Sequence, residues 1–366
     1  MKSKILHVIT NFAQIGGAEQ MLVRFINASP EEVEHVIISL IEVSDILASQ
    51  IDREVKYYAI KARSPIELIC SAFKVSRLLK AEKATLIYSW MYHANFSSAL
   101  AKVISGKKVP LFWGVRHSLD DLKSEKVSTK LAIYAGRALR FIPDKVIYCS
   151  KKSMCQHISL GYSEESHSIY IPNGYQIPEF KKKNFEKRSF VLGAAGRFHE
   201  AKNYKMLFKS VAPILLTRKD IKLKVAGRNV DNENNIIKGY LKEFSIDSKQ
   251  VELVGQQSDM KCFYESIDFF VLSSKTEGFP NVLAEAGGHG CIVFSTDVGD
   301  ANLIVNDSKR IVAVNDSDSL TSVLLEYLSF TPDALTKISE DSAKYIRENY
   351  SIEVIVKRVI AIMEKF

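Results

Sequence analysis

Short apolar segments of β-strand character alternate with segments of helical character along the whole chain, and no other feature restricts the possible folds as strongly. This order is typical of a parallel sheet that is covered by helices on both of its faces. We therefore expect an α/β protein. The predicted strands lie near residues 5–10, 35–40, 55–60, 86–89, 111–115, 145–149, 190–195, 223–226, 251–254, 269–272 and 292–295, and the predicted helices include 18–27, 67–79, 129–140, 205–216 and 281–288.

Two domains of similar size are expected, because 366 residues exceed the length at which a single hydrophobic core usually stops growing. A polar, basic stretch at residues 181–184 interrupts the alternation, and we interpret it as the interdomain linker. We predict a first domain over residues 1–176 and a second over 177–351. The last segment, near 352–366, is apolar at helical spacing, and this helix can pack back on the first domain.

The composition argues for a cytoplasmic protein. No segment offers the roughly 20 consecutive apolar residues that a membrane-spanning helix needs, and the apolar stretch after Lys4 is too short for a signal peptide. The five cysteines are scattered and form no C-x-x-C pair. This pattern fits reduced thiols rather than a zinc or redox site.

The chain is basic, with a net charge of +8, and its first half carries most of the excess, with 23 basic and 17 acidic residues up to Phe180. This excess is consistent with an ordinary solvated surface, or with attraction to an anionic acceptor or membrane. Any membrane contact would then be peripheral, on the inner face. The charge is too thinly spread to favour nucleic-acid binding.

Open parallel sheets bind ligands at the carboxyl ends of their strands, so the residues just after the predicted strands are the candidates for a site. The first such loop holds Gly16 and Gly17, which let the backbone approach an anion beside a helix start, although a tight turn explains them equally. The second holds Arg197 and Lys202, two cations suited to a diphosphate, although exposed cations are often only solvated.

A third loop is the most specific segment of the chain, and its candidates for donor binding are Glu277, Gly278, Phe279, Pro280, Asn281, Val282 and Glu285. Pro280 is expected at the first helical position, which leaves the amides of Asn281 and Val282 to bind a phosphate. Glu285 lies on the same helix face as Asn281 and can accept two hydroxyl hydrogen bonds from a ribose, while Glu277 can hold a sugar hydroxyl. The alternative is a pair of acids that stabilise a helix dipole.

The chain resembles the retaining glycosyltransferases of family 4, whose hallmark is two glutamates separated by seven residues in a Gly-Phe-Pro-type sequence. Glu277 and Glu285 match this hallmark, and residues 16–19, 171–174 and 196–203 are similar as well. The resemblance implies the GT-B fold, in which two Rossmann-like, doubly wound parallel-sheet domains face each other across a cleft. It places the acceptor in the first domain and a nucleotide-sugar donor in the second.

The resemblance also implies roles for single residues. Arg197 and Lys202 are expected to hold the donor diphosphate, together with the amide of Gly16. Glu285 is expected to hold the ribose, and Glu277 to contact the transferred sugar. His117, which follows the predicted strand at 111–115, is expected beside the reacting sugar.

Acceptor binding is the least specific prediction. Trp90, Tyr92, His93 and Asn95 follow the predicted strand at 86–89 and are candidates to line the acceptor cleft, with Arg116 beside His117. Packing of these aromatic residues in the core is an equal alternative.

The expected reaction moves a hexose or N-acetylhexosamine, with retention, from a nucleotide-diphosphate sugar, with UDP as the expected nucleotide. The expected acceptor is a glycan or lipid-linked oligosaccharide in cell-surface polysaccharide synthesis. No Asp-x-Asp pair lies in a metal-binding context, so we expect no metal or other cofactor. Two alternatives remain, an enzyme of the same architecture such as a nucleotide-sugar epimerase or a phosphorylase, and a non-catalytic sugar-nucleotide binding protein.

Overall fold

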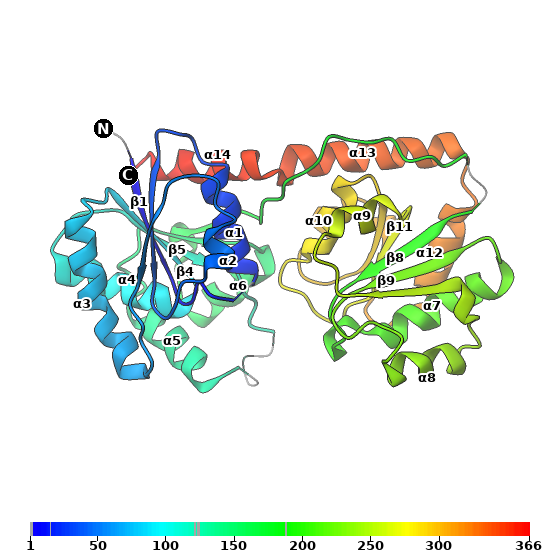
Figure 1. Ribbon diagram of the computed structural model, residues 1–366, viewed down its shortest axis with the longest axis horizontal. Helices are drawn as coiled ribbons and strands as arrows, with labels where there is room; N and C mark the ends of the chain where they lie inside the picture. The colour runs from blue at the N-terminus through cyan, green and yellow to red at the C-terminus, as the bar shows by residue number, and fades with distance from the viewer. Residues whose placement is uncertain (1–2, 15, 121, 123–124, 187–188) are drawn as a thin grey trace. The chain divides into compact units, whose positions relative to one another are not determined.

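The computed structural model describes residues 3–14, 16–120, 122, 125–186 and 189–366. It divides into two compact units, one of Met1–Gln176 with Ile352–Phe366 and one of Ile177–Ser351. Each unit is a parallel sheet with helices on both faces, as Figure 1 shows. The predicted α/β class is therefore confirmed.

The first unit contains a seven-stranded sheet in the order β3-β2-β1-β4-β5-β6-β7, and all pairings are parallel. The order reverses direction between β1 and β4, which is where open α/β sheets form their ligand crevices. The strands are β1 (Lys4–Ile9), β2 (Glu34–Ser39), β3 (Lys56–Ala59), β4 (Leu86–Trp90), β5 (Leu111–Val115), β6 (Lys145–Tyr148) and β7 (Ser168–Tyr170).

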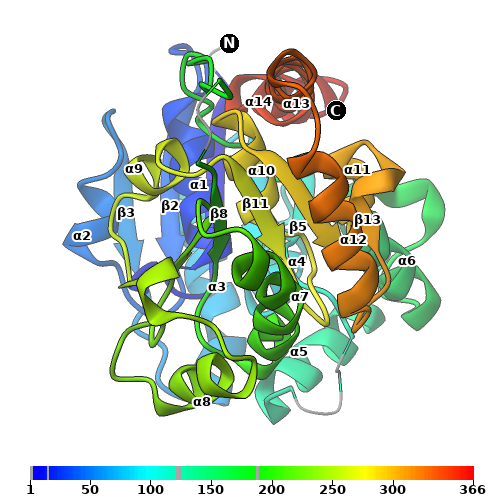
Figure 2. The same ribbon diagram turned by 90° about the vertical axis from the view of Figure 1, so that its right-hand side faces the viewer.

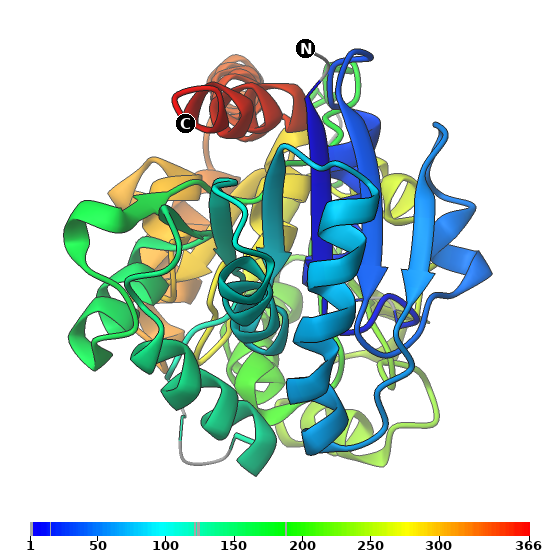
Figure 3. The ribbon, with the colours of Figure 1, turned by 90° about the vertical axis from the view of Figure 1, so that its left-hand side faces the viewer.

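Helices cover both faces of this sheet, because successive side chains of each strand point to opposite faces. On β1, Ile5 and Ile9 pack under α1 and α14, whereas Leu6 and Val8 pack under α3, α4 and α5. Figure 3 shows α3, in light blue, in front of the strands. The helices are α1 (Gly17–Asn27), α2 (Asp45–Ala48), α3 (Pro65–Ala81), α4 (Tyr92–Ser105), α5 (Val127–Ala138), α6 (Lys151–Leu160) and α14 (Ile352–Met363).

The C-terminal helix α14 packs on the first unit through a glycine. A Cβ atom on Gly174 would lie 2.9 Å from the Cα atom of Ile352, so only glycine permits this approach. The amide of Ile352 donates to the carbonyl of Tyr175 at 2.8 Å. The chain thus returns to the first unit at the residue where α14 begins.

The second unit contains a six-stranded parallel sheet in the order β10-β9-β8-β11-β12-β13. Its strands are β8 (Val191–Ala195), β9 (Lys222–Ala226), β10 (Val251–Gly255), β11 (Phe269–Leu272), β12 (Ile292–Thr296) and β13 (Ile311–Val312). Helices α7, α8 and α12 lie on one face, and α10 and α11 lie on the other, with α13 outside α10 (Figure 2). The helices are α7 (Tyr204–Thr217), α8 (Asn235–Glu243), α9 (Met260–Glu265), α10 (Asn281–Gly288), α11 (Ala301–Val305), α12 (Ser317–Leu328) and α13 (Pro332–Tyr350).

The structure differs from the sequence predictions at the sheet edges and at the linker. The edge strands β7 and β13 were not predicted, because strands of three and two residues carry too little alternation to be seen. The basic stretch at 181–184 packs on the second unit instead of bridging the units. The ammonium of Lys183 donates to the carbonyls of Tyr264 and Ile267 at 2.7 and 2.6 Å, at the end of α9 and in the turn before β11.

Within the part of the chain that the structure describes, no helix combines the length and the apolar character that crossing a membrane would require.

Candidate active site

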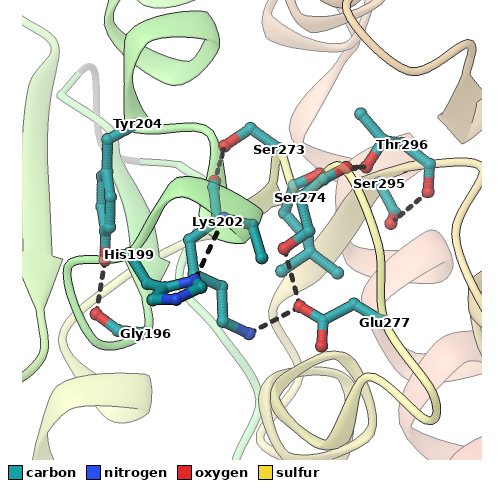
Figure 4. Close-up of polar contacts among 11 residues, drawn as sticks. Gly196, His199, Lys202, Tyr204, Ser273, Ser274, Glu277, Ser295 and Thr296 are labelled. Atoms are coloured by element: carbon teal, nitrogen blue, oxygen red, sulfur yellow. Dashed lines mark hydrogen bonds and ion pairs between the residues drawn. The ribbon is translucent and has the colours of Figure 1, made fainter. Parts of the chain in front are cut away.

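The candidate donor site lies at the carboxyl edge of the second sheet. Because β8 and β11 are parallel neighbours, the loops that follow them lie at the same edge. The loop after β8 runs through a short 3-10 helix (Glu200–Lys202) into α7, and the loop after β11 runs into α10. Figure 4 shows how side chains of these two loops meet.

An ion pair joins the two loops. The ammonium of Lys202 lies 2.5 Å from Oε1 of Glu277, and the hydroxyl of Ser274 donates to the same oxygen at 2.6 Å. Only 22% of the Lys202 side chain and 14% of the Glu277 side chain are exposed. This pair is therefore more strongly shielded from solvent than an ordinary surface ion pair, and its geometry is fixed by the Ser274 hydroxyl.

Backbone contacts hold the two loops together behind this pair. The hydroxyl of Ser273 donates to the carbonyl of Lys202 at 3.0 Å (Figure 4), and the amide of Lys275 donates to the carbonyl of Ala201 at 2.7 Å. The stem of Lys202 lies against Gly196, where an added Cβ would be 3.2 Å from its Cδ and Cε atoms. The ammonium of Lys202 is thus held by its surroundings and not only by its partner.

Two glycines bring further loops against this edge. A Cβ on Gly227, whose φ is +152°, would lie 1.8 Å from the carbonyl oxygen of Gly196. A Cβ on Gly299, whose φ is +53°, would lie 2.4 Å from the carbonyl oxygen of Gly278. The loops after β9 and β12 therefore pack directly on the backbone of the two donor-site loops, which only glycine allows.

Arg197 follows Gly196 directly and is exposed. Among the described residues its guanidinium has no hydrogen-bond or ion-pair partner. The five N–H donors of this group are thus available to an anion at this edge of the sheet.

Helix α10 has the predicted bounds 281–288, but the role of Pro280 differs from the prediction. The helix begins at Asn281, and Pro280 is its N-cap with φ −78° and ψ 81° instead of its first residue. These angles form an inverse γ-turn, in which the amide of Asn281 donates to the carbonyl of Phe279 at 2.9 Å. The amide of Asn281, which we expected to face a phosphate, is therefore used inside the turn.

Glu285 lies on the same helix but engages a different partner. Its Oε2 atom accepts a hydrogen bond of 2.9 Å from the hydroxyl of Tyr264, a buried residue of α9. Phe279, which precedes the helix, is buried against Tyr350 with ring centroids 6.0 Å apart. The structure thus ties Glu277 to Lys202, and Glu285 to α9.

In the first unit, the glycine loop stands at the start of α1. Gly16 is the N-cap in extended conformation, and α1 begins at Gly17. A Cβ on Gly16 would lie 2.5 Å from Oε2 of Glu19, so the carboxylate lies across this glycine, and burial raises the pKa of Glu19. Ile15 of the same loop lies outside the described residues.

His117 follows β5 and is held by a carboxylate. Its Nε2 atom lies 2.8 Å from Oε1 of Glu125, and its backbone carbonyl accepts a hydrogen bond of 2.5 Å from the hydroxyl of Ser153 on α6. About two fifths of the His117 side chain is exposed, at 39%. The ring is therefore oriented by Glu125 and accessible at the carboxyl edge of the first sheet.

Most of the candidate acceptor residues are buried instead. Trp90 and Asn95 are fully buried, and Tyr92 is 2% exposed. Trp90 donates to Nδ1 of His7 at 3.3 Å, and the hydroxyl of Tyr92 lies 2.9 Å from Nε2 of His157. These three side chains therefore form part of the core and do not line an acceptor site. This is the alternative that the sequence left open.

The other two candidates are partly buried. Arg116 donates to Oδ1 of Asn173 at 2.7 Å and to the hydroxyl of Tyr88 at 3.2 Å, so it joins the loop after β5 to the segment after β7. His93 is half-buried at the start of α4, and burial lowers its pKa. Of the acceptor candidates, His93 is the one that keeps a partly exposed imidazole at this edge.

Comparison with known proteins decides the family. Residues 189–329, which hold both donor-site loops, match the family model described as glycosyl transferases group 1. This segment of the chain belongs to the group 1 glycosyltransferases.

Its relatives include two capsular polysaccharide biosynthesis glycosyltransferases of Staphylococcus aureus. CapH is 25% identical over 240 residues, which cover 62% of this chain and 63% of CapH, so over a third of CapH lies outside the match. CapM is 23% identical over 316 residues, which cover 81% of this chain and 80% of CapM. Anabaena HepE, solved in complex with UDP, has the same fold, with a TM-score of 0.80 at 17% identity over 99% of this chain and all of HepE.

Four residues that shape the site of this glycosyltransferase were not singled out from the sequence as site residues. Ser274 and Tyr264 hold the two glutamates, Gly227 supports the backbone at Arg197, and Glu125 orients His117. Gly227 follows a predicted strand, which is a usable signal for a close backbone approach. The other three are recognisable only once the loops are placed in space.

Proposed function

We propose that this group 1 glycosyltransferase moves a hexose or N-acetylhexosamine from a UDP-linked sugar, with retention, to a glycan or lipid-linked oligosaccharide. In this proposal the second unit binds the donor and the first unit binds the acceptor. The reaction serves cell-surface polysaccharide synthesis on the cytoplasmic side of the membrane. The proposal needs no metal ion, so EDTA is expected to leave turnover unchanged.

The observation that carries the proposal is the Lys202–Glu277 pair, which joins the loops after β8 and β11 inside the segment that matches the family model. An ammonium has three donors, so Lys202 can bind Glu277 and a phosphate oxygen at the same time. Oε1 of Glu277 is shared by Lys202 and Ser274, and Oε2 can accept a hydrogen bond from a sugar hydroxyl. Arg197 adds a second cation beside the same backbone turn.

These groups support a displacement at the anomeric carbon. The bond between this carbon and the diphosphate oxygen breaks, and Arg197 and Lys202 stabilise the charge that develops on the leaving diphosphate. The acceptor hydroxyl attacks from the face that the diphosphate leaves, and its proton passes to a diphosphate oxygen. His117, oriented by Glu125, contacts the reacting sugar.

The relatives support the donor and the pathway. HepE was solved with UDP, and the two staphylococcal relatives are named for capsular polysaccharide biosynthesis. A uridine diphosphate donor and a saccharide acceptor agree with these names and with the cationic loop at the edge of the second sheet.

The test is turnover of UDP-sugars by the variants Arg197→Ala and Lys202→Ala. Loss of one preorganised donor to a developing anion typically lowers kcat by about 100-fold or more. We expect a loss of this size in each variant, with a protein that remains folded and melts cooperatively. Normal turnover in both variants would refute the assignment.

The alternative enzyme of the same architecture, an epimerase, would convert the donor without an acceptor. Product analysis with the UDP-sugar alone therefore separates the two reactions. A new sugar stereoisomer formed in the absence of acceptor would favour the epimerase. Tight UDP-sugar binding without turnover, over a broad range of saccharide acceptors, would favour a non-catalytic binding protein.

A further inference from the structure

Exposed apolar side chains gather on two helices of the first unit. We call these six residues the α3–α5 surface, namely Ile66, Ile69 and Phe73 on α3, exposed by 73%, 52% and 57%, and Val127, Leu131 and Tyr134 on α5, exposed by 71%, 63% and 48%. In the second unit, by contrast, the described helices expose single large apolar residues, namely Leu216 on α7, Ile236 on α8 and Leu325 on α12. Isolated residues of that kind are normal, whereas a group indicates an interaction surface.

The spacing shows that each helix presents one apolar stripe to solvent. The three residues of α3 follow an i, i+3, i+7 pattern, and those of α5 follow i, i+4, i+7, so each set lies on one helix face. The opposite faces are buried, through Val75 and Leu79 on α3 and through Ile133 on α5. Each helix therefore has two apolar faces. One face packs in the hydrophobic core, and the other is exposed to solvent.

The two stripes lie at the same end of the unit. Helices α3 and α5 flank α4 on one face of the first sheet, and Figure 3 shows both helices on this side. In a parallel sheet the connecting helices begin at the carboxyl edge of the strands. The stripes occupy the beginning of each helix, so they lie toward the edge at which His117 follows β5.

The same two helices carry an excess of cations. Helix α3 carries Lys74, Arg77 and Lys80 against one acid, Glu67, and α5 carries Lys130 and Arg137 with no acid. Apolar side chains beside an excess of lysine and arginine are typical of helices that lie at the surface of an anionic bilayer. A second copy of this chain is a poorer partner, because the same cations would face each other.

The surface continues into the candidate acceptor site. Glu125, two residues before α5, holds His117 at 2.8 Å, and the backbone of Ser128 in the first turn of α5 hydrogen-bonds to His93. We propose that the α3–α5 surface docks the protein on an anionic phospholipid bilayer and so presents a lipid-linked acceptor to the loop of His117. The presentation of an acceptor rests on the proposed function, whereas the docking does not.

Co-sedimentation of the full chain with phosphatidylcholine vesicles, with and without phosphatidylglycerol, tests the proposal. We expect binding to the anionic vesicles that weakens as salt is added, since salt screens these cations. The double variant Phe73→Ser and Leu131→Ser is expected to bind at least about tenfold more weakly, because two apolar side chains no longer enter the bilayer. Neutralisation by Arg77→Gln and Lys80→Gln is expected to weaken binding by about 25-fold.

The matched control is the double variant Leu216→Ser and Ile236→Ser, which removes two apolar residues of the second unit that are 48% and 55% exposed. It is expected to bind anionic vesicles as the parent protein does. Equal binding by the parent protein and the α3–α5 variants, or an equal loss in the control, would overturn the proposal. Loss of a dimer in light scattering, without a change in vesicle binding, would assign the surface to a second copy and overturn it as well.

The melting temperature with and without UDP distinguishes a failure of the docking proposal from a failure of the proposed function. UDP raises the melting temperature of a protein that binds it in the folded state. We expect the same UDP-dependent rise in the parent protein and in all three double variants. If no UDP-dependent rise occurs but vesicle binding follows the pattern above, the proposed function fails and the docking surface stands.

Discussion

At the scale of single residues, Lys202 is the main candidate to bind the donor diphosphate, because its ammonium is fixed by Glu277 and by packing on Gly196. A hydrogen bond from a charged donor contributes about 1.5–3 kcal/mol, which corresponds to about 10–150-fold in affinity. We expect Lys202→Ala to weaken UDP binding by a factor in this range, measured by isothermal titration calorimetry.

Lys275 offers a matched control for this variant. It comes from the loop after β11 and, like Lys202, forms an ion pair with a glutamate of the opposite loop, here Glu200 of the loop after β8, at 2.8 Å. Glu200 is 84% exposed, so this pair resembles an ordinary surface pair. Lys275→Ala is expected to leave UDP affinity within about twofold, and a loss equal to that of Lys202→Ala would contradict a specific role for Lys202.

Glu125 is a positioning residue in this account, because it acts on the sugar only through His117. Glu125→Gln removes the negative charge of the carboxylate but keeps an amide that can form a hydrogen bond with the His117 imidazole. We expect kcat to fall about tenfold with KM for the donor unchanged, because the neutral amide holds the imidazole less firmly than the charged carboxylate does. The measurement is kcat and KM for a UDP-sugar.

A second acid–histidine pair in the first unit serves as the control for Glu125. Glu164 lies 3.9 Å from His167, and their side chains are 49% and 45% exposed. Both residues precede β7, at the opposite end of the parallel strands from the loop of His117. Glu164→Gln is expected to change neither kcat nor KM. An unchanged kcat in Glu125→Gln, or an equal fall in Glu164→Gln, would show that Glu125 does not act through His117.

At the scale of elements, glycines decide how the loops of the second unit meet. We expect Gly227→Ala to lower the free energy of unfolding by several kcal/mol, on the order of 3, since the new methyl group would meet the carbonyl of Gly196 in a conformation that alanine avoids. Chemical denaturation of the variant measures this loss.

Gly239→Ala in the same unit is the control for Gly227→Ala. Gly239 lies inside α8 with nothing within 4 Å of an added Cβ. Gly239→Ala is expected to raise the free energy of unfolding by about 0.5–1 kcal/mol, because alanine favours the helix. Equal effects in the two variants would show that close packing at Gly227 is not what selects glycine there.

The elements also show how far the sequence could predict the structure. Buried central strands such as β5 and β11 were found at their observed bounds, because a continuous apolar run between polar turns is a strong signal. Helix α10 has its predicted bounds, 281–288, but Pro280 was expected inside its first turn, because the sequence cannot show that Pro280 closes a γ-turn. The tight pairs Lys202–Glu277 and His117–Glu125 join residues 75 and 8 positions apart, and only the folded chain shows them.

The candidate acceptor residues at the end of β4 illustrate the opposite error. Trp90 is the last residue of β4, and Tyr92 and Asn95 follow it on α4. All three side chains point inward, where His7, His157 and Ser89 provide hydrogen-bond partners. Position after a strand therefore identifies an edge of the sheet, whereas the direction of each side chain depends on the packing beneath it.

At the scale of the whole molecule, buried histidines of the first unit make stability dependent on pH. Burial lowers the pKa of His35 from 6.5 to about 3 and that of His157 to about 4. As the pH falls, His35 and His157 are protonated in the unfolded chain before they are protonated in the folded protein. The free energy of unfolding is therefore highest above pH 6.5 and falls as the pH drops toward the folded pKa values. Each histidine is expected to contribute about 1.4 kcal/mol per pH unit in this window.

Urea denaturation of the variant His35→Asn tests this dependence, since the asparagine oxygen can replace the acceptor that binds His7 at 2.9 Å. Between pH 6 and 4 the free energy of unfolding of the variant is expected to fall less steeply, by about 1.4 kcal/mol per pH unit. The control is His167→Asn, which replaces an exposed histidine. Parallel curves for the parent protein and His35→Asn would contradict the assignment.

The central claim is that a nucleotide diphosphate binds at the carboxyl edge of the second sheet, between the loops after β8 and β11. A crystal structure of the full chain with bound UDP measures this most directly. We predict diphosphate oxygens within hydrogen-bond distance of the Lys202 ammonium and the Arg197 guanidinium, with Glu277 still paired to Lys202. A diphosphate bound elsewhere, with Arg197 and Lys202 in solvent, would contradict the account.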